Sequence, residues 1–351
     1  MTQSTRRTFL AHSAGLCAAS LGAMNCGRAD ELSPQRAGEM ITPEAQRAID
    51  AGLAYLLERQ RDDGSLGSGQ YRSNVAVCGL AGLAFMASGS TPNRGPFGAN
   101  VERCIDFLMQ NTREDGFINV DERSNHGPMY GHGFAALFLA ECYGMTMRTD
   151  IRETLAKAVH LIVETQNVEG GWRYQPRRED ADISVTICQI MALRAARNAG
   201  IYVPKKTVDE CTDYVKRCQN RGDGGFAYQL TGSPHSEFPR SAAGVVALYM
   251  AGVYDGPELQ SGLDYLMQHL PRGQGSLNEP HYFYGHYYAV QAMWHAGGKY
   301  WDAWYPAIRD ELVGQQRTDG SWLSPICTEY AAAMACIILQ LPNNFLPIIQ
   351  R

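Results

Sequence analysis

The stretch QNVEGGWRY, residues Gln166–Tyr174, contains a Gln-x-x-x-Gly-x-Trp spacing that returns in QQRTDGSWL at Gln315–Leu323. The same Gln and Gly spacing occurs in QRDDGSLG from Gln60, and looser copies begin at residues 110, 219 and 268. The glycines of the six copies are Gly64, Gly116, Gly170, Gly224, Gly275 and Gly320, which are separated by 52, 54, 54, 51 and 45 residues. A period of this length indicates a repeat architecture.

Each copy lies between two helical segments with different apolar patterns. The segment VERCIDFLMQ, residues 101–110, has apolar residues at i, i+3, i+4 and i+7, on one face only. The segment NVAVCGLAGLAFMASG, residues 74–89, is apolar on nearly all sides. A helix of the first kind covers a core, whereas a helix of the second kind must be buried. Six outer and six inner helices in alternation predict an all-α fold, an α/α toroid of six helical hairpins over residues 42–351.

The repeated motif resembles the QW repeats of squalene–hopene and oxidosqualene cyclases, and the GGF and GGW loops are similar to those of protein prenyltransferase β subunits. The resemblance to this prenyltransferase/squalene oxidase repeat family covers about Thr42 to Leu341 and implies the same toroid fold. We interpret the motif as a structural clasp: the Gln amide bridges neighbouring loop backbones, and the aromatic ring fills the gap between hairpins.

In such a ring, the loops that lead into the inner helices all lie at one end, so polar side chains far apart in sequence converge there. Concave pockets with convergent polar groups are the usual ligand sites of proteins. The residues that we expect to contact a ligand at this mouth are Tyr71, His126, Tyr130, His132, Arg240, His281, Tyr284, His286 and Glu329.

The segment EDADISVT, residues 179–186, holds the candidate catalytic group. Squalene–hopene-type cyclases carry Asp-x-Asp-Asp-Thr at the start of an inner helix, where the middle Asp protonates an alkene. Asp180 and Asp182 match the first two aspartates, so the resemblance implies that Asp182 is the general acid. We expect the nearby Asp180 to disfavour a second negative charge and so to keep Asp182 protonated. Ile183 replaces the third aspartate and Ser184 replaces the threonine. The alternative is that Asp182 only caps the helix that follows.

A second resemblance concerns metal binding. Prenyltransferase β subunits bind zinc through an Asp-x-Cys after a GGF loop and a His from a later repeat. Asp180 and Asp182 fall near the first two positions, although no Cys is present. We therefore expect no cofactor, with a zinc ion held by Asp180, Asp182 and either His281 or His286 as the alternative.

Two classes of function follow from these patterns. The first is an enzyme, a terpene cyclase/mutase-like or prenyltransferase-like protein that acts on a polyisoprenoid or triterpenoid. The second is a non-catalytic secreted module that binds a hydrophobic small molecule, a peptide or a glycan at the mouth. The chain has the length of one helical barrel, whereas full cyclases resemble two joined barrels.

The N-terminus predicts export. Arg6 and Arg7 precede Phe9, Leu10 and a small-residue apolar stretch, an order typical of a twin-arginine signal peptide. We expect the signal over residues 1–29, a linker over residues 30–41 and a periplasmic or extracellular location. The formal net charge of −5 does not favour a nucleic-acid partner, and no apolar run is long enough to span a membrane. The sequence leaves the oligomeric state open.

Overall fold

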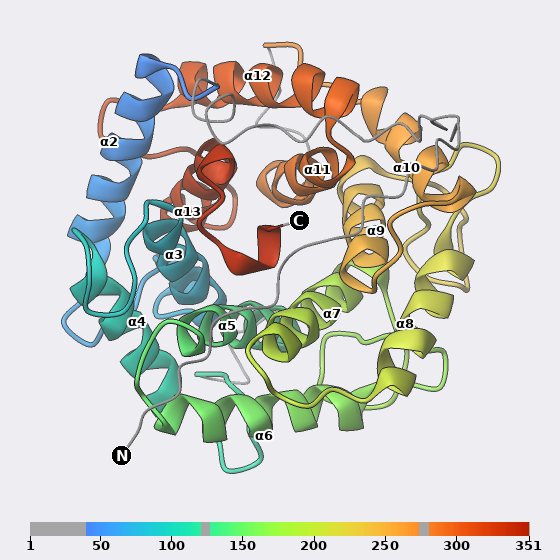
Figure 1. The fold of residues 1–351 in the computed structure, drawn as a ribbon, viewed down its shortest axis with the longest axis horizontal. Helices are drawn as coiled ribbons and strands as arrows, with labels where there is room; N and C mark the ends of the chain where they lie inside the picture. The colour runs from blue at the N-terminus through green and yellow to red at the C-terminus, as the bar shows by residue number, and fades with distance from the viewer. Residues whose placement is uncertain (1–39, 121–126, 274–280, 351) are drawn as a thin grey trace, which may run out of the picture.

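The computed structural model describes residues 40–120, 127–273 and 281–350, and in this part of the chain the helices form two concentric layers (Figure 1). The outer layer consists of α2 (Pro43–Arg59), α4 (Gly98–Gln110), α6 (Asp150–Thr165), α8 (Lys205–Cys218), α10 (Pro257–Met267) and α12 (Gly298–Gln315). The inner layer consists of α3 (Val75–Ala87), α5 (Pro128–Tyr143), α7 (Ile183–Asn198), α9 (Phe238–Met250), α11 (Tyr282–Ala296) and α13 (Thr328–Gln340). The predicted all-α toroid of six hairpins is confirmed.

The apolar pattern of each helix explains its layer. The outer helix α4 buries Val101, Cys104, Ile105 and Leu108 on the face that the sequence predicts. The inner helix α3 buries every residue except Ala76. Each inner helix packs against the next one, and α13 packs against α3, which closes the ring.

The repeat motif joins neighbouring hairpins. The Gln166 side-chain amide donates to the carbonyl of Gly170 in its own loop and to that of Thr207 in the next outer helix, at 2.9 Å each. The buried Trp172 indole donates to the carbonyl of Ile162 at 2.7 Å. Gly170 adopts φ = 101°, and a Cβ atom there would lie 2.2 Å from the carbonyl oxygen of Glu210. Only glycine fits this close approach between the loop and the next helix.

The two ends of the ring differ. At one end, the loops before the inner helices surround an open mouth. At the other end, the C-terminal segment with η2 (Leu341–Asn343) and η3 (Pro347–Ile349) turns into the ring (Figure 1). The Ile348 backbone N–H donates to the buried Glu141 carboxylate at 3.0 Å, and the Trp294 indole donates to the Ile349 carbonyl at 3.1 Å. The C-terminal segment therefore packs against the ends of inner helices α5 and α11.

The predicted signal peptide and most of the predicted linker lie outside the described residues. In the described ranges, no helix combines the length and the apolar character that a bilayer crossing requires.

Candidate functional site

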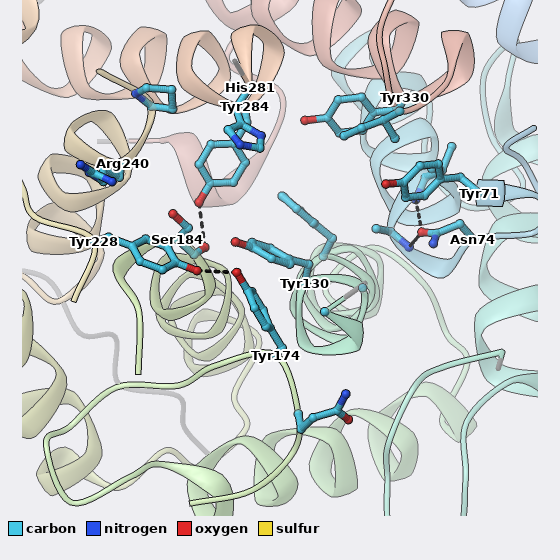
Figure 2. Close-up of a pocket in the computed structure, with 18 of the residues that line it drawn as sticks. Tyr71, Asn74, Tyr130, Tyr174, Ser184, Tyr228, Arg240, His281, Tyr284 and Tyr330 are labelled. Atoms are coloured by element: carbon cyan, nitrogen blue, oxygen red, sulfur yellow. Dashed lines mark hydrogen bonds between the residues drawn. The ribbon is translucent and has the colours of Figure 1, made fainter. Parts of the chain in front are cut away.

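A cavity of about 890 Å³ opens at the mouth, where the inner helices begin (Figure 2). Its wall is rich in aromatic rings, and a polar rim surrounds them. The lining residues are Tyr71, Asn74, Ala76, Val77, Gly127, Tyr130, Gly131, Phe134, Tyr174, Gln175, Ser184, Tyr228, Glu237, Pro239, Arg240, His281, Tyr284, Ile326 and Tyr330. Seven of them are Tyr or Phe, from residues spread between positions 71 and 330.

Asp182 lies directly beside this cavity, at the start of α7. Its backbone N–H donates to the Trp172 carbonyl at 2.9 Å, and the next N–H, of Ile183, donates to the Tyr228 carbonyl at 3.0 Å. The loop is thus held from two successive repeats. The Asp182 side chain caps α7 by accepting a hydrogen bond from the Val185 N–H at 2.8 Å. The capping role predicted as the alternative is therefore present.

The Asp182 carboxyl is fully buried. Burial raises the pKa of Asp182 to about 6, because the interior solvates the charged form less well than water does. Four groups oppose this rise in the pKa by favouring the charged form. They are the Val185 N–H, the Tyr228 hydroxyl, which donates to Asp182 Oδ2 at 3.1 Å, the Arg173 guanidinium, whose Nε lies 3.7 Å from Oδ2, and the Ser184 N–H.

Asp180 does not cooperate with Asp182 in the predicted way. Its side chain is half exposed and forms an ion pair with Arg173 at the surface. The raised pKa of Asp182 arises from burial, and Asp180 is not among its causes. The expectation that a neighbouring aspartate keeps the acid protonated is therefore wrong, because Arg173 neutralises Asp180.

Two tyrosines that the sequence analysis missed connect Asp182 to the cavity. Tyr174 and Tyr228 line the cavity, and their hydroxyl groups are hydrogen-bonded to each other (Figure 2). Arg173 lies over both rings, at 5.1 Å and 5.9 Å from the ring centroids. The repeat contained a signal: Tyr174 and Tyr228 each stand four residues after the glycine of their motif, in GGWRY and GGFAY.

Five of the sequence-predicted residues line the cavity: Tyr71, Tyr130, Arg240, His281 and Tyr284. The Tyr284 hydroxyl donates to the Ser184 carbonyl at 2.7 Å, which links α11 to α7 across the mouth. The Arg240 side chain pairs with Glu237 at 3.3 Å. These residues come from several hairpins, as the topology of the ring predicts.

Three other predicted residues do not line the cavity. His132 is buried between α5 and α6, where Nδ1 accepts a hydrogen bond from the Ile118 N–H at 3.2 Å and Nε2 lies 3.3 Å from the Ala158 carbonyl oxygen. The backbone N–H groups equivalent to that of Ile118 in the next two repeats belong to Trp172 and Phe226. They donate to the hydroxyl groups of Thr186 and Ser241, respectively. His132 therefore holds the repeat together, and its assignment to the mouth is wrong.

The other two side chains lie behind the cavity wall. His286 is buried against the rings of Phe238, Tyr282 and Trp304, on the side of α11 that faces the outer layer. Glu329 is buried at the start of α13 and accepts a hydrogen bond from the Ser68 hydroxyl at 2.8 Å. His126 lies outside the described residues.

A model of the prenyltransferase alpha-alpha toroid domain family matches residues 100–278, just over half of the 351 residues. The chain belongs to this family. No curated protein matches it.

Solved structures share the toroid fold of this family member at low identity. The type II terpene cyclase MstE from Scytonema is 15% identical, with a TM-score of 0.59 over 86% of this chain and 99% of that chain. The GH76 α-mannanase from Bacteroides thetaiotaomicron is 12% identical, with a TM-score of 0.62 over 88% and 98%. Cellobiose 2-epimerase from Bacillus thermoamylovorans is 13% identical, with a TM-score of 0.62 over 89% and 100%. At these identities the likeness shows the fold alone.

The alternative zinc site of prenyltransferase-like chemistry does not fit the residues of this toroid. Among the described residues, no three His, Cys, Asp or Glu side chains form a group that holds a metal ion. Asp180 is paired with Arg173, Asp182 with Tyr228, and His286 is enclosed by aromatic rings. Asp180 and Asp182 thus have other partners and His286 faces the outer layer, which leaves His281 at the cavity wall without the two aspartates as fellow ligands.

Proposed function

We propose that this toroid protein is an acid-initiated, terpene cyclase-like enzyme that binds a polyisoprenoid in the aromatic cavity, with Asp182 as the general acid. The observation that carries the proposal is a buried carboxyl with a raised pKa directly behind the cavity wall. An aromatic cavity alone fits a binding protein, whereas a carboxyl that holds a proton near neutral pH adds a chemical function.

The electrostatics of Asp182 suit an acid that gives up one proton per cycle. With a pKa of about 6, about half of the Asp182 carboxyl is protonated at pH 6 and about a tenth at pH 7. After proton transfer, the Val185 N–H and the nearby Arg173 guanidinium stabilise the carboxylate. A group tuned close to the working pH serves best in general acid catalysis.

The cavity suits an apolar substrate that becomes a cation. The aromatic rings of Tyr71, Tyr130, Tyr284 and Tyr330, together with Phe134, line the space, and aromatic rings stabilise positive charge through their faces. The volume of about 890 Å³ lies in the range of small-molecule sites. The neighbour MstE has been solved with geranylgeranyl dihydroxybenzoate as substrate and with merosterolic acid A as product. We extend only the substrate class, a polyprenyl chain, to this protein.

The arrangement does not favour glycoside hydrolysis, the activity named for one of the structural neighbours. Hydrolysis of a glycosidic bond generally uses two carboxyl groups that flank it. Among the described residues that line the cavity, the one carboxylate is Glu237, which is paired with Arg240. Asp182 lies behind Tyr228.

The direct test is turnover of polyprenyl probes. Purified protein is incubated with squalene, geranylgeraniol and farnesol, and extracts are analysed for cyclised isomers or hydrated products by gas chromatography and mass spectrometry. We expect conversion of at least one probe and its loss, by about 100-fold or more, in Asp182→Asn. Asp209→Asn, an exposed carboxylate paired with Lys205 on α8, is the matched control and is expected to retain activity.

The outcomes separate the two classes of function. Equal turnover in Asp182→Asn and in the parent would remove Asp182 as the acid. Saturable binding of a probe without conversion would instead identify a binding module.

A further inference from the structure

The acid and the cavity are separated by one side chain. Asp182 has no exposed surface and does not line the cavity, whereas Tyr228 lines it and donates its hydroxyl hydrogen to Asp182 Oδ2 at 3.1 Å. A substrate in the cavity therefore meets the Tyr228 hydroxyl before it can meet the carboxyl. Direct protonation of the substrate by Asp182 would require Tyr228 to move away.

The hydrogen-bond chain continues beyond Tyr228. Its oxygen is also hydrogen-bonded to the Tyr174 hydroxyl, and Tyr174 is the donor of this bond while Tyr228 donates to Asp182. Tyr174 is 37% exposed and lines the mouth, so its hydroxyl connects the chain to solvent. Asp182, Tyr228 and Tyr174 thus form a continuous path from the buried carboxyl to the mouth, with a branch into the cavity at Tyr228. Figure 2 shows the Tyr228–Tyr174 part of this path.

We propose that Tyr228 is a catalytic residue that passes the proton of Asp182 to the substrate, and that Tyr174 returns a proton from solvent to Asp182 through Tyr228. This inference rests on the proposed function, because it names the route of the proton in that reaction.

The transfer is balanced and uses no further reactant. When Asp182 is protonated, the hydrogen bond between Asp182 and Tyr228 reverses: the Asp182 hydroxyl donates to the Tyr228 oxygen, and the Tyr228 hydrogen turns into the cavity. Asp182 then gives its hydrogen to the Tyr228 oxygen while the original Tyr228 hydrogen moves to an alkene carbon of the substrate. The alkene π electrons form the new C–H bond, so the substrate becomes a carbocation, Asp182 becomes a carboxylate and Tyr228 stays neutral. After cyclisation, the product cation loses a proton to water, and Tyr174 and Tyr228 pass one proton from water back to Asp182.

The surroundings of Tyr228 fit a relay and not an independent acid. Burial and the neighbouring Asp182 raise the pKa of Tyr228, so this phenol does not ionise on its own. It can release its proton only as it receives another. Arg173 lies over the rings of both tyrosines and near Asp182, so one guanidinium orders all three groups.

The first experiment measures the Asp182–Tyr228 link without a substrate. The infrared carbonyl band of the protonated Asp182 carboxyl is identified by its absence in Asp182→Asn and is titrated with pH. Tyr228→Phe keeps the ring and removes a hydrogen bond to the charged carboxylate, so the apparent pKa of Asp182 is expected to rise. An unchanged titration would overturn the relay, because it would mean that the two groups are not coupled.

The second experiment separates delivery from return of the proton, with squalene or geranylgeraniol as the probe that the parent converts. Tyr228→Phe is expected to lower single-turnover conversion by about 100-fold or more with probe binding retained. Tyr174→Phe is expected to retain the first turnover and to slow the later ones. Tyr254→Phe, which removes an exposed phenol hydroxyl on the α9–α10 loop, is the control.

Each result tests one part of the proposal. If Asp182→Asn loses turnover and Tyr228→Phe keeps it, the relay is wrong and the proposed function stands. If the parent converts no probe, the proposed function and the relay both fail. If Tyr174→Phe slows the first turnover as much as Tyr228→Phe does, the assigned direction of proton return is wrong. Thermal melting of each variant checks that a loss does not come from unfolding.

Discussion

The Gln316 side-chain amide in the last repeat donates to the carbonyl of Ala48 in the first outer helix at 2.8 Å, across 268 residues of chain. The same nitrogen donates to the Gly320 carbonyl in its own loop at 3.1 Å. At Gln166 the same pair of contacts joins two successive hairpins. At Gln316 it joins the two ends of the toroid, so α12 and α2 are held as if they were neighbours in sequence.

This closure predicts a specific loss of stability. Gln316→Ala leaves the Ala48 and Gly320 carbonyls without their shared donor, which we expect to lower the free energy of unfolding by about 1–3 kcal/mol. Gln46→Ala is the control, because its exposed amide donates to the Asp50 carboxylate on the surface of α2. Urea unfolding followed by circular dichroism measures both, and equal losses would show that the bridge between α12 and α2 adds nothing.

The indole rings of the motif are expected to contribute more to the free energy of unfolding than the Gln316 amide does. Trp172→Ala and Trp322→Ala each remove a buried ring and its hydrogen bond, to the carbonyl of Ile162 or Leu312. We expect each change to lower the free energy of unfolding by about 3–5 kcal/mol. Trp172→Phe keeps most of the apolar volume and should cost less than Trp172→Ala; the reverse order in denaturant titrations would contradict the packing role.

The raised pKa of Asp182 predicts that the stability of the fold depends on pH. The pKa of Asp182 is about 6 in the folded protein, above the ordinary aspartate value of 3.8 that applies to the unfolded chain. The native state therefore binds more protons than the unfolded state between these pH values. The contribution of Asp182 to stability is therefore full below about pH 4 and is lost as the pH rises through 6. The difference between these two pKa values corresponds to at most about 3 kcal/mol.

Asp182→Asn provides the measurement, because Asn also caps helices and does not titrate. The stability of the parent relative to this variant is expected to fall from pH 4 to pH 7 and then to level off. A difference that is constant across this range would mean that the Asp182 carboxyl titrates normally.

The N-terminal segment leads to a prediction about export. Replacement of Arg6 and Arg7 by Lys is expected to leave the precursor in the cytoplasm, because the twin-arginine pathway reads the arginine pair. Fractionation of a bacterial host with antibody detection measures the result. A precursor with both lysines that is exported as well as the parent would show that the pair does not direct this chain.

The architecture could be predicted from the sequence because it depends on local and periodic information. The spacing of Gln, Gly and Trp, together with the contrast between segments such as residues 101–110 and 74–89, determines which helices lie outside and which lie inside. Tyr130, Arg240 and His281 could be placed at the mouth for the same reason, since the topology brings all the loops before inner helices to one end.

The wrong assignment of His132 and His286 to the mouth has a physical cause. His132 and His286 stand near the starts of inner helices, yet a buried helix has neighbours on every side, and residue type alone does not say which side a side chain faces. His132 faces the next repeat, and His286 faces the outer layer. Tyr228 was missed because its contact with Asp182 joins residues 46 positions apart in different repeats.

The sequence by itself therefore determined the ring, its two layers and the end at which a site can form, because these follow from apolar periodicity and from a repeated turn. Only the tertiary structure decided which side chains form the cavity and what charge they hold. Burial of Asp182, the pairing of Asp180 with Arg173 and the tyrosine chain to the mouth all depend on the rotation of each helix about its own axis. That rotation is set by packing against several neighbouring helices at once, which no single segment of the chain encodes.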